Sequence, residues 1–129
     1  GFTPDGKRAY VACELVSTVY AIDMDSRQVI AEIKAGTYAN GVAMAPDGSR
    51  VYVSNGKDAT VSVIRTSDHL IEAIIPVRKR PCNIAVSPDG RKLYVANGRS
   101  DSVTVIDTHR LEAVSDIQVG ELPWGVVIR

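Results

Sequence analysis

The stretch PDGSRVYVSN, residues 46–55, decides the fold of this 129-residue chain. Nearly the same sequence begins forty-two residues earlier, as PDGKRAYVAC from Pro4, and forty-two residues later, as PDGRKLYVAN from Pro88. A fixed period of about 40 residues indicates a repeat architecture, in which each repeat is one supersecondary unit. The copies align without insertion or deletion, which predicts one continuous region, 1–129, with repeats at approximately 4–45, 46–87 and 88–129.

Each repeat contains four short apolar runs, rich in Val, Ile and Tyr and separated by turn residues. In the second copy these runs are residues 41–45, 50–54, 60–65 and 71–77. Their length and composition predict β-strands, here termed A, B, C and D. Pro-Asp-Gly between A and B suits a tight hairpin, because Pro presets the first turn residue and Gly adopts positive φ. Each copy is therefore predicted to be a four-stranded antiparallel meander.

The patterning of apolar residues changes across each predicted sheet. Strands A, B and C are nearly continuous in apolar and small residues, as expected for strands covered on both faces. Strand D alternates in the first copy, with Val29, Ala31 and Ile33 on one side and residues such as Glu32 on the other. Pro76 lies in the second strand D, where Pro is tolerated only at a sheet edge. These features predict an all-β fold, a β-propeller with three four-stranded antiparallel blades; a β-solenoid is the alternative.

The two ends of the chain predict an incomplete ring. The first copy lacks its own strand A, and residues 124–128 read as a strand A with no following strand B. Propellers have roughly four to eight blades, so three blades are not expected to close a ring. We therefore expect an open arc, which either missing N-terminal blades or a second copy of the chain would complete.

The repeat carries a recognisable motif, SPDG–YVxN–VxVID. It reads APDGSRVYVSN in the second copy and SPDGRKLYVAN in the third, whereas the first copy has YVAC and the second has Ile64-Arg65 where the others have Ile-Asp. The chain thus resembles the YVTN β-propeller family of bacteria and archaea. This resemblance implies the C-terminal part of a seven-bladed ring and a periplasmic or extracellular location. It also implies a possible association with an exported quinoprotein dehydrogenase system; related-looking propellers include lactonases and the haem d1 domain of nitrite reductase.

Composition excludes several classes of protein. The net charge is zero, which argues against a nucleic-acid binder, and no run of eighteen apolar residues could span a membrane. Two cysteines fit neither a disulfide framework nor a zinc cluster. Cys13 ends a strand B and Cys82 begins a strand A in another blade, so we expect two free thiols, with Cys82 close to the central channel.

Candidate binding residues lie where the copies differ, because a residue that recurs in a repeat protein is usually structural. The differences gather in the B–C and D–A loops, which share one face of a propeller. The basic run 78–80 could hold an anion or an acidic partner, or it could be a solvated charge run. Trp124 could stack on a ligand or pack between blades. The candidate ligand or partner residues are Arg78, Lys79, Arg80, Asn40, Cys82, Asn83 and Trp124.

Other polar residues favour structural roles. His69 and His109 lie in C–D turns on the opposite face, and we expect solvated turn residues there rather than metal or haem ligands. Asn55 and Asn97 are predicted to hydrogen-bond their own loop backbone. No motif of a nucleophilic, phosphate-binding or metalloprotease site occurs, so the sequence predicts no catalytic residue, no metal site and no cofactor.

The sequence therefore predicts a non-enzymatic repeat scaffold that binds a protein or a small-molecule ligand. One alternative is a lactonase-like or haem- or quinone-associated enzyme domain, whose ligands lie in blades absent from this chain. Lactonase-like propellers need acidic and amide ligands in the channel, and strand A offers Asn40 and Asn83 but no carboxylate. A surface-layer or adhesion repeat is the other alternative.

Overall fold

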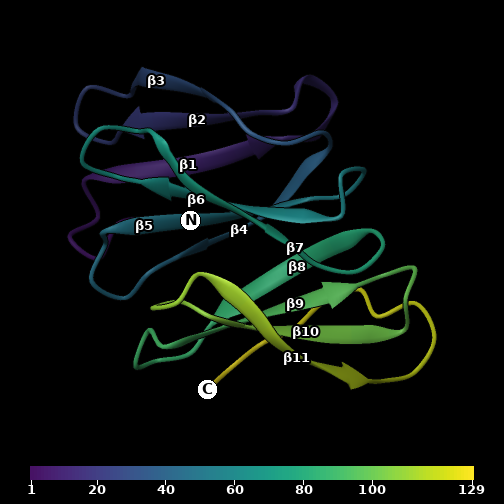
Figure 1. Cartoon of the computed structure of the whole chain (residues 1–129). Coiled ribbons are helices and arrows are strands. Elements are labelled where there is room, and N and C mark those ends of the chain that lie inside the picture. The colour runs from purple at the N-terminus through teal and green to yellow at the C-terminus, as the bar shows by residue number, and fades with distance from the viewer.

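Eleven strands form three antiparallel sheets in the computed structural model, which describes all 129 residues (Figure 1). Blade 1 contains β1 (Arg8–Cys13), β2 (Thr18–Asp23) and β3 (Gln28–Lys34). Blade 2 contains β4 (Ala39–Met44), β5 (Arg50–Asn55), β6 (Thr60–Arg65) and β7 (Ile71–Pro76). Blade 3 contains β8 (Pro81–Val86), β9 (Lys92–Asn97), β10 (Ser102–Asp107) and β11 (Glu112–Gln118). The 3₁₀ turn η1 (Glu14–Val16) is the one helical element, and no helix is long and apolar enough to cross a bilayer.

The sheets are the predicted blades of a partial propeller. Hydrogen-bonded neighbours follow chain order in every sheet, and inner strand β4 lies next to β8 of the following blade. Blade 1 has three strands, as expected from its missing strand A, and a single bridge between Phe2 and Ala9 stands in that place. No strand B of this chain lies beside residues 124–128, as expected, but these residues do not form the predicted strand.

The A–B turns have the predicted chemistry. Gly6, Gly48 and Gly90 adopt φ values of 70°, 75° and 73°. In each turn the Asp carboxylate accepts the backbone N–H of the residue two positions later, at 2.9–3.0 Å. A Cβ on Gly48 would lie 2.9 Å from Cδ of Pro4, so adjacent turns touch and leave no room for a larger residue. These turns form one face of the arc, here termed the turn face.

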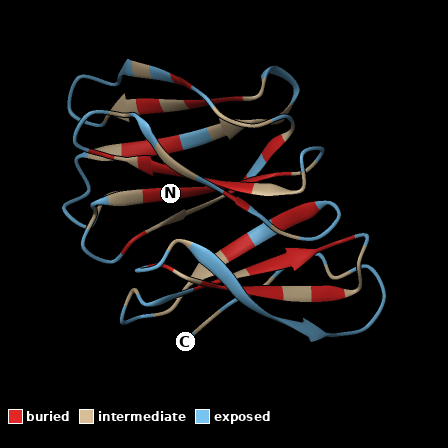
Figure 2. Cartoon of the chain, viewed as in Figure 1, coloured by how far each residue is buried: buried red, intermediate tan, exposed pale blue.

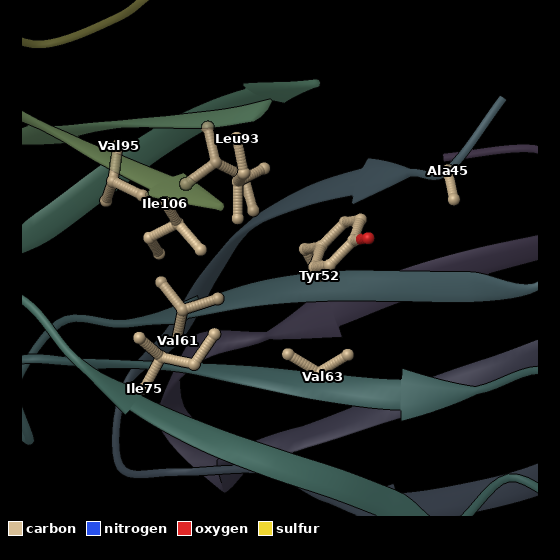
Figure 3. Packing of buried hydrophobic residues seen from close by; sticks show 9 residues of the cluster. Ala45, Tyr52, Val61, Val63, Ile75, Leu93, Val95 and Ile106 are labelled. Carbon is tan, nitrogen blue, oxygen red and sulfur yellow. The ribbon is translucent and has the colours of Figure 1, made fainter. Parts of the chain in front are cut away.

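The core lies between blades. One cluster joins Tyr52, Val61 and Ile75 of blade 2 to Leu93 and other residues of blade 3 (Figure 3). A second cluster joins blade 1 to blade 2. The middle strands β5, β6, β9 and β10 are mostly buried, whereas β11 is exposed along its length (Figure 2). The blade-to-blade contact is therefore what buries the apolar side chains of each sheet.

The alternation predicted for strand D is interrupted by a β-bulge. In blade 1, Ala21 pairs with Ala31 but Ile22 pairs with Val29, which leaves Ile30 as an extra residue. Val29 is exposed and does not share the buried side of Ile33, contrary to the prediction. The same bulge recurs at the equivalent positions of β7 and β11. A bulge places two residues opposite one, so strict period-two patterning fails there.

Candidate functional site: the junction of blades 2 and 3

The B–C and D–A loops lie on one face of the arc, here termed the loop face. At the junction of blades 2 and 3, two of these loops are joined through their backbones. The N–H of Gly98 donates to the carbonyl of Arg80 at 2.8 Å, and that of Arg99 donates to Lys79 at 3.1 Å. In return, the N–H of Lys79 donates to Oγ of Ser100 at 2.9 Å. These bonds fix the backbone from which three cationic side chains project.

The junction of blades 1 and 2 uses the same backbone pattern with different side chains. Lys57 N–H donates to the carbonyl of Thr37 at 3.2 Å, and Thr37 N–H donates to a carboxylate oxygen of Asp58 at 2.6 Å. Ser100 occupies the position of Asp58 in the next copy, so the second junction keeps this hydrogen bond but lacks the negative charge. Lys79 occupies the position of Thr37 in the next copy of the repeat. The second junction is therefore the more positive of the two.

A cleft of about 240 Å³ opens at this junction. Its lining consists of Gly56, Lys57, Ala59, Lys79, Arg80 and Arg99. None of the four cationic side chains takes part in an ion pair. Lys57 Nζ lies 4.7 Å from the ring centre of Tyr38, and the guanidinium of Arg80 lies 5.8 Å from that of Trp124. We term Lys57, Lys79, Arg80 and Arg99 the cationic junction.

Arg78 does not belong to this group, although it is part of the basic run. Its guanidinium pairs with Asp116 on β11 at 2.6 Å. Hydrogen bonds from Thr104 and then Arg78 lower the pKa of the Asp116 carboxyl. Arg78 thus ties the end of blade 2 to the outer strand of blade 3, and it is the least available of the predicted ligand residues.

The remaining predicted site residues lie on the loop face but make separate contacts. Asn40 is exposed and its amide contacts Glu14 at 3.4 Å, whereas Asn83 accepts the N–H of Val126 at 3.4 Å. Cys82 is buried, its thiol faces the carbonyl of Arg80 at 3.3 Å, and both cysteines are free, as predicted. Trp124 is 71% exposed, whereas Cys82, at the equivalent position of the preceding copy, is buried.

His69 is not the solvated turn residue that the sequence predicted. Its Nε2 lies 3.0 Å from the hydroxyl of Tyr10, and the two ring centres are 5.9 Å apart. Burial, and then the charge of Arg8, lower the pKa of His69. His69 precedes β7 and Lys79 follows it, so the two lie at opposite ends of this strand, as expected. His109, in contrast, is exposed.

The prediction that Asn55 and Asn97 bond their own loop backbone is also wrong. The amide of Asn55 donates to Thr60 and Ser62, and that of Asn97 donates to Ser102 and Thr104. These partners are hydroxyls on the paired strand C, at 2.9–3.2 Å. Both asparagines are fully buried, so each one links strands B and C inside its blade.

Sequence reasoning missed Lys57 and Arg99, which complete the cationic junction. The two residues occupy the same position in successive copies, where the first copy has Leu15. This position could have been recognised, because it varies between copies and lies in a B–C loop. What the sequence could not show is that the D–A loop of blade 2 lies against the B–C loop of blade 3.

Comparison with known protein families identifies the family of this chain. Residues 1–122 match the family described as lactonase, 7-bladed beta-propeller. The chain belongs to this family. The match agrees with the three blades seen here, and it leaves the finer YVTN assignment a prediction. A comparison with curated proteins finds no match.

Several solved structures share the fold. Kuenenia stuttgartiensis hydrazine synthase is 29% identical with a TM-score of 0.91, over 95% of this chain and 35% of that one. A putative 6-phosphogluconolactonase from Bacteroides fragilis is 23% identical with a TM-score of 0.84, over 97% and 39%. Dihydro-heme d1 dehydrogenase NirN, solved in complex with DHE, is 24% identical with a TM-score of 0.77, over 91% and 25%. This chain therefore spans well under half the length of these relatives.

Proposed function

We propose that this chain is part of a non-enzymatic propeller that binds a protein or small-molecule ligand on its loop face. The observation that supports this proposal is the cationic junction, where four charged side chains line one cleft without a carboxylate partner. Charges on a protein surface are ordinarily of mixed sign, and a single-sign cluster attracts a partner of opposite charge. The candidate ligand residues are Lys79 and Arg80, now with Lys57 and Arg99.

The wider setting of the protein follows from the resemblance to YVTN-type propellers. We place it in the periplasm or outside the cell, with further blades completing the ring and with no cofactor of its own. An association with an exported quinoprotein dehydrogenase would fit this setting. The repeated SPDG–YVxN motif supports the placement.

Site-specific photocrosslinking in the source cells tests the proposal. A photoreactive residue at Asn83 or Ser100 would report from the loop face, and one at Lys7 or Lys92 would report from the turn face. We expect crosslinks to a ligand or partner from the loop-face positions. Crosslinks confined to the turn face would contradict the proposal.

A lactonase-like enzyme is the second candidate, and membership of the lactonase family favours it. Such an enzyme would draw acidic ligands from other blades, because strand A here supplies only the amides Asn40 and Asn83. Steady hydrolysis of sugar lactones by the whole purified protein, lost in the double variant Asn40→Ala/Asn83→Ala, would establish this function. An absorption spectrum and metal analysis of the same preparation would test the haem- or quinone-associated form.

A further inference from the structure

We propose that the cationic junction is a docking site for an acidic segment of a partner protein. The inference rests on the proposed function and names the chemistry of the ligand. The three loops that form the site belong to adjacent blades of this chain, so the cleft is lined by residues of this chain alone. Three observations support the choice of an acidic peptide. The cationic side chains have no acidic partner, the backbone N–H groups of the loops already donate within the protein, and an aromatic ring lies beside the cleft.

The charge at this junction is not neutralised by the acids nearest in sequence. Asp58 accepts the N–H of Thr37, and Asp101 accepts the N–H of Leu122 at 3.0 Å. Each of these carboxylates therefore holds a neighbouring D–A loop in place. The one basic side chain of the loop that has an acidic partner is Arg78, which turns to Asp116. Four positive charges thus face solvent from one cleft, although the whole chain has a net charge of zero.

The loop backbone offers few donors to a compact anion such as phosphate. Sites for single phosphates use successive free backbone N–H groups. Here the N–H groups of Gly56, Lys57, Gly98 and Arg99 donate to loop carbonyls, and that of Lys79 donates to Ser100. The charge is instead presented on long side chains from three loops. This arrangement suits several carboxylates spread along a peptide better than one concentrated anion.

The surface beside the cleft includes an aromatic ring. The ring centre of Trp124 lies 5.8 Å from the guanidinium of Arg80, which lines the cleft. Arg, Trp and Tyr are the residues that most often carry binding energy in protein interfaces. A partner segment that combines Glu or Asp with an apolar side chain would contact both parts of this surface.

Fluorescence anisotropy with the whole protein tests the inference. The probe is a fluorescein-labelled octapeptide of six glutamates around two leucines, and its control replaces every Glu by Gln. We expect the glutamate peptide to bind and the glutamine peptide not to bind. Binding should weaken as salt rises, because the Debye length falls to about 8 Å at physiological ionic strength.

Three double variants locate the site. Lys57→Gln/Lys79→Gln should weaken peptide binding about tenfold, since an exposed ion pair contributes up to about 1 kcal/mol, or fivefold. Lys7→Gln/Lys92→Gln removes two exposed lysines from the turn face and should leave binding unchanged. Arg80→Gln/Arg99→Gln should weaken binding at least as much as the first pair, because Arg also contacts carboxylates in a bidentate manner.

Each other outcome overturns the inference. Equal losses in the loop-face and turn-face variants would show that binding is nonspecific. Inorganic phosphate that binds while the glutamate peptide does not would show a compact anion site instead. Photocrosslinks from the loop face to a neutral ligand would leave the proposed function standing and remove this inference, so the two can fail separately.

Discussion

Asn97 shows how a single side chain can hold a blade together. Its amide joins Ser102 and Thr104 on β10 from within the core, where a lost hydrogen bond leaves polar atoms without water. Leaving a buried donor or acceptor unpaired costs about 1–3 kcal/mol. We expect Asn97→Ala to lower the free energy of unfolding by that amount, measured by urea denaturation. Asn83→Ala, at an exposed position, is the control and should change it by less than about 0.5 kcal/mol.

We expect His69 to make the contact between blades 1 and 2 dependent on pH. Its pKa is lowered by burial and by Arg8, while Asp68 opposes this shift and the Tyr10 hydroxyl faces Nε2. The unfolded chain therefore takes up a proton at a higher pH than the folded chain. Stability should be complete above the unfolded pKa of about 6.5 and should fall as pH drops towards the lower folded value.

The variant His69→Leu tests this pH dependence. Leu111 occupies the equivalent position in blade 3 with φ of 58°, close to the 59° of His69, so Leu is compatible with this backbone. Thermal unfolding at several pH values should show a smaller loss of stability between pH 7 and about pH 5 in the variant. An unchanged pH profile would mean that another group controls it.

These two residues also show where sequence reasoning stops. The partners of Asn97 lie five and seven positions along the chain, but they become neighbours only when β9 and β10 pair. The partner of His69 is fifty-nine positions away in another blade. The sequence therefore predicts a solvated residue at this turn, because the turn itself gives no sign of the neighbouring blade.

At the scale of the element, most strands could be predicted closely. The run 60–65 matches β6 without change, since β-branched residues between Asn, Gly and Asp turns leave little freedom in the boundaries. The bulges in β3, β7 and β11 could not be predicted from alternation. The extra residue in β7 is Glu72, which pairs with Arg50 of β5 through two hydrogen bonds at 2.8 Å.

This ion pair should contribute more than the exposed pairs of the protein. The side chains of Arg50 and Glu72 are 28% and 23% exposed, against 67% and 58% for Arg110 and Glu112. Bidentate, partly buried pairs are stronger than single exposed ones. We expect Glu72→Gln to reduce the free energy of unfolding by about 1 kcal/mol, and Glu112→Gln by less than about 0.3 kcal/mol. Similar values for both variants in urea denaturation would contradict this interpretation.

At the scale of the whole molecule, the arc has two open ends, and blade 3 forms one of them. Ile33 and Ile75 occupy equivalent positions and are 5% and 2% exposed, whereas Ile117 is 48% exposed. The difference arises because blades 2 and 3 cover the first two residues, and no blade of this chain covers the third. The repeat predicted the blades and their order, and the exposure of Ile117 measures how much burial a further blade would add.

If a further blade packs against blade 3, the substitution Ile117→Ala should have a larger effect on the free energy of unfolding in the whole protein than in this chain alone. In the whole protein, Ile117→Ala should cost about 2–4 kcal/mol, the same as Ile75→Ala, because both would leave a cavity between blades. In the 129-residue chain alone, Ile117→Ala should cost much less than Ile75→Ala. A small effect of Ile117→Ala in the whole protein would mean that blade 3 is not covered by another blade.

The contact of Tyr10 with His69 has a consequence for how the blades find one another. Leu111 occupies the position of His69 in the next copy and packs against the cluster that contains Tyr52, so two junctions built on the same backbone present different chemistry to their neighbours. If blade 3 docked where blade 2 belongs, the hydroxyl of Tyr10 would meet an aliphatic side chain and lose its hydrogen bond. Small mismatches of this kind make the packing between neighbouring blades specific. This specificity disfavours assembly of near-identical repeats in the wrong order.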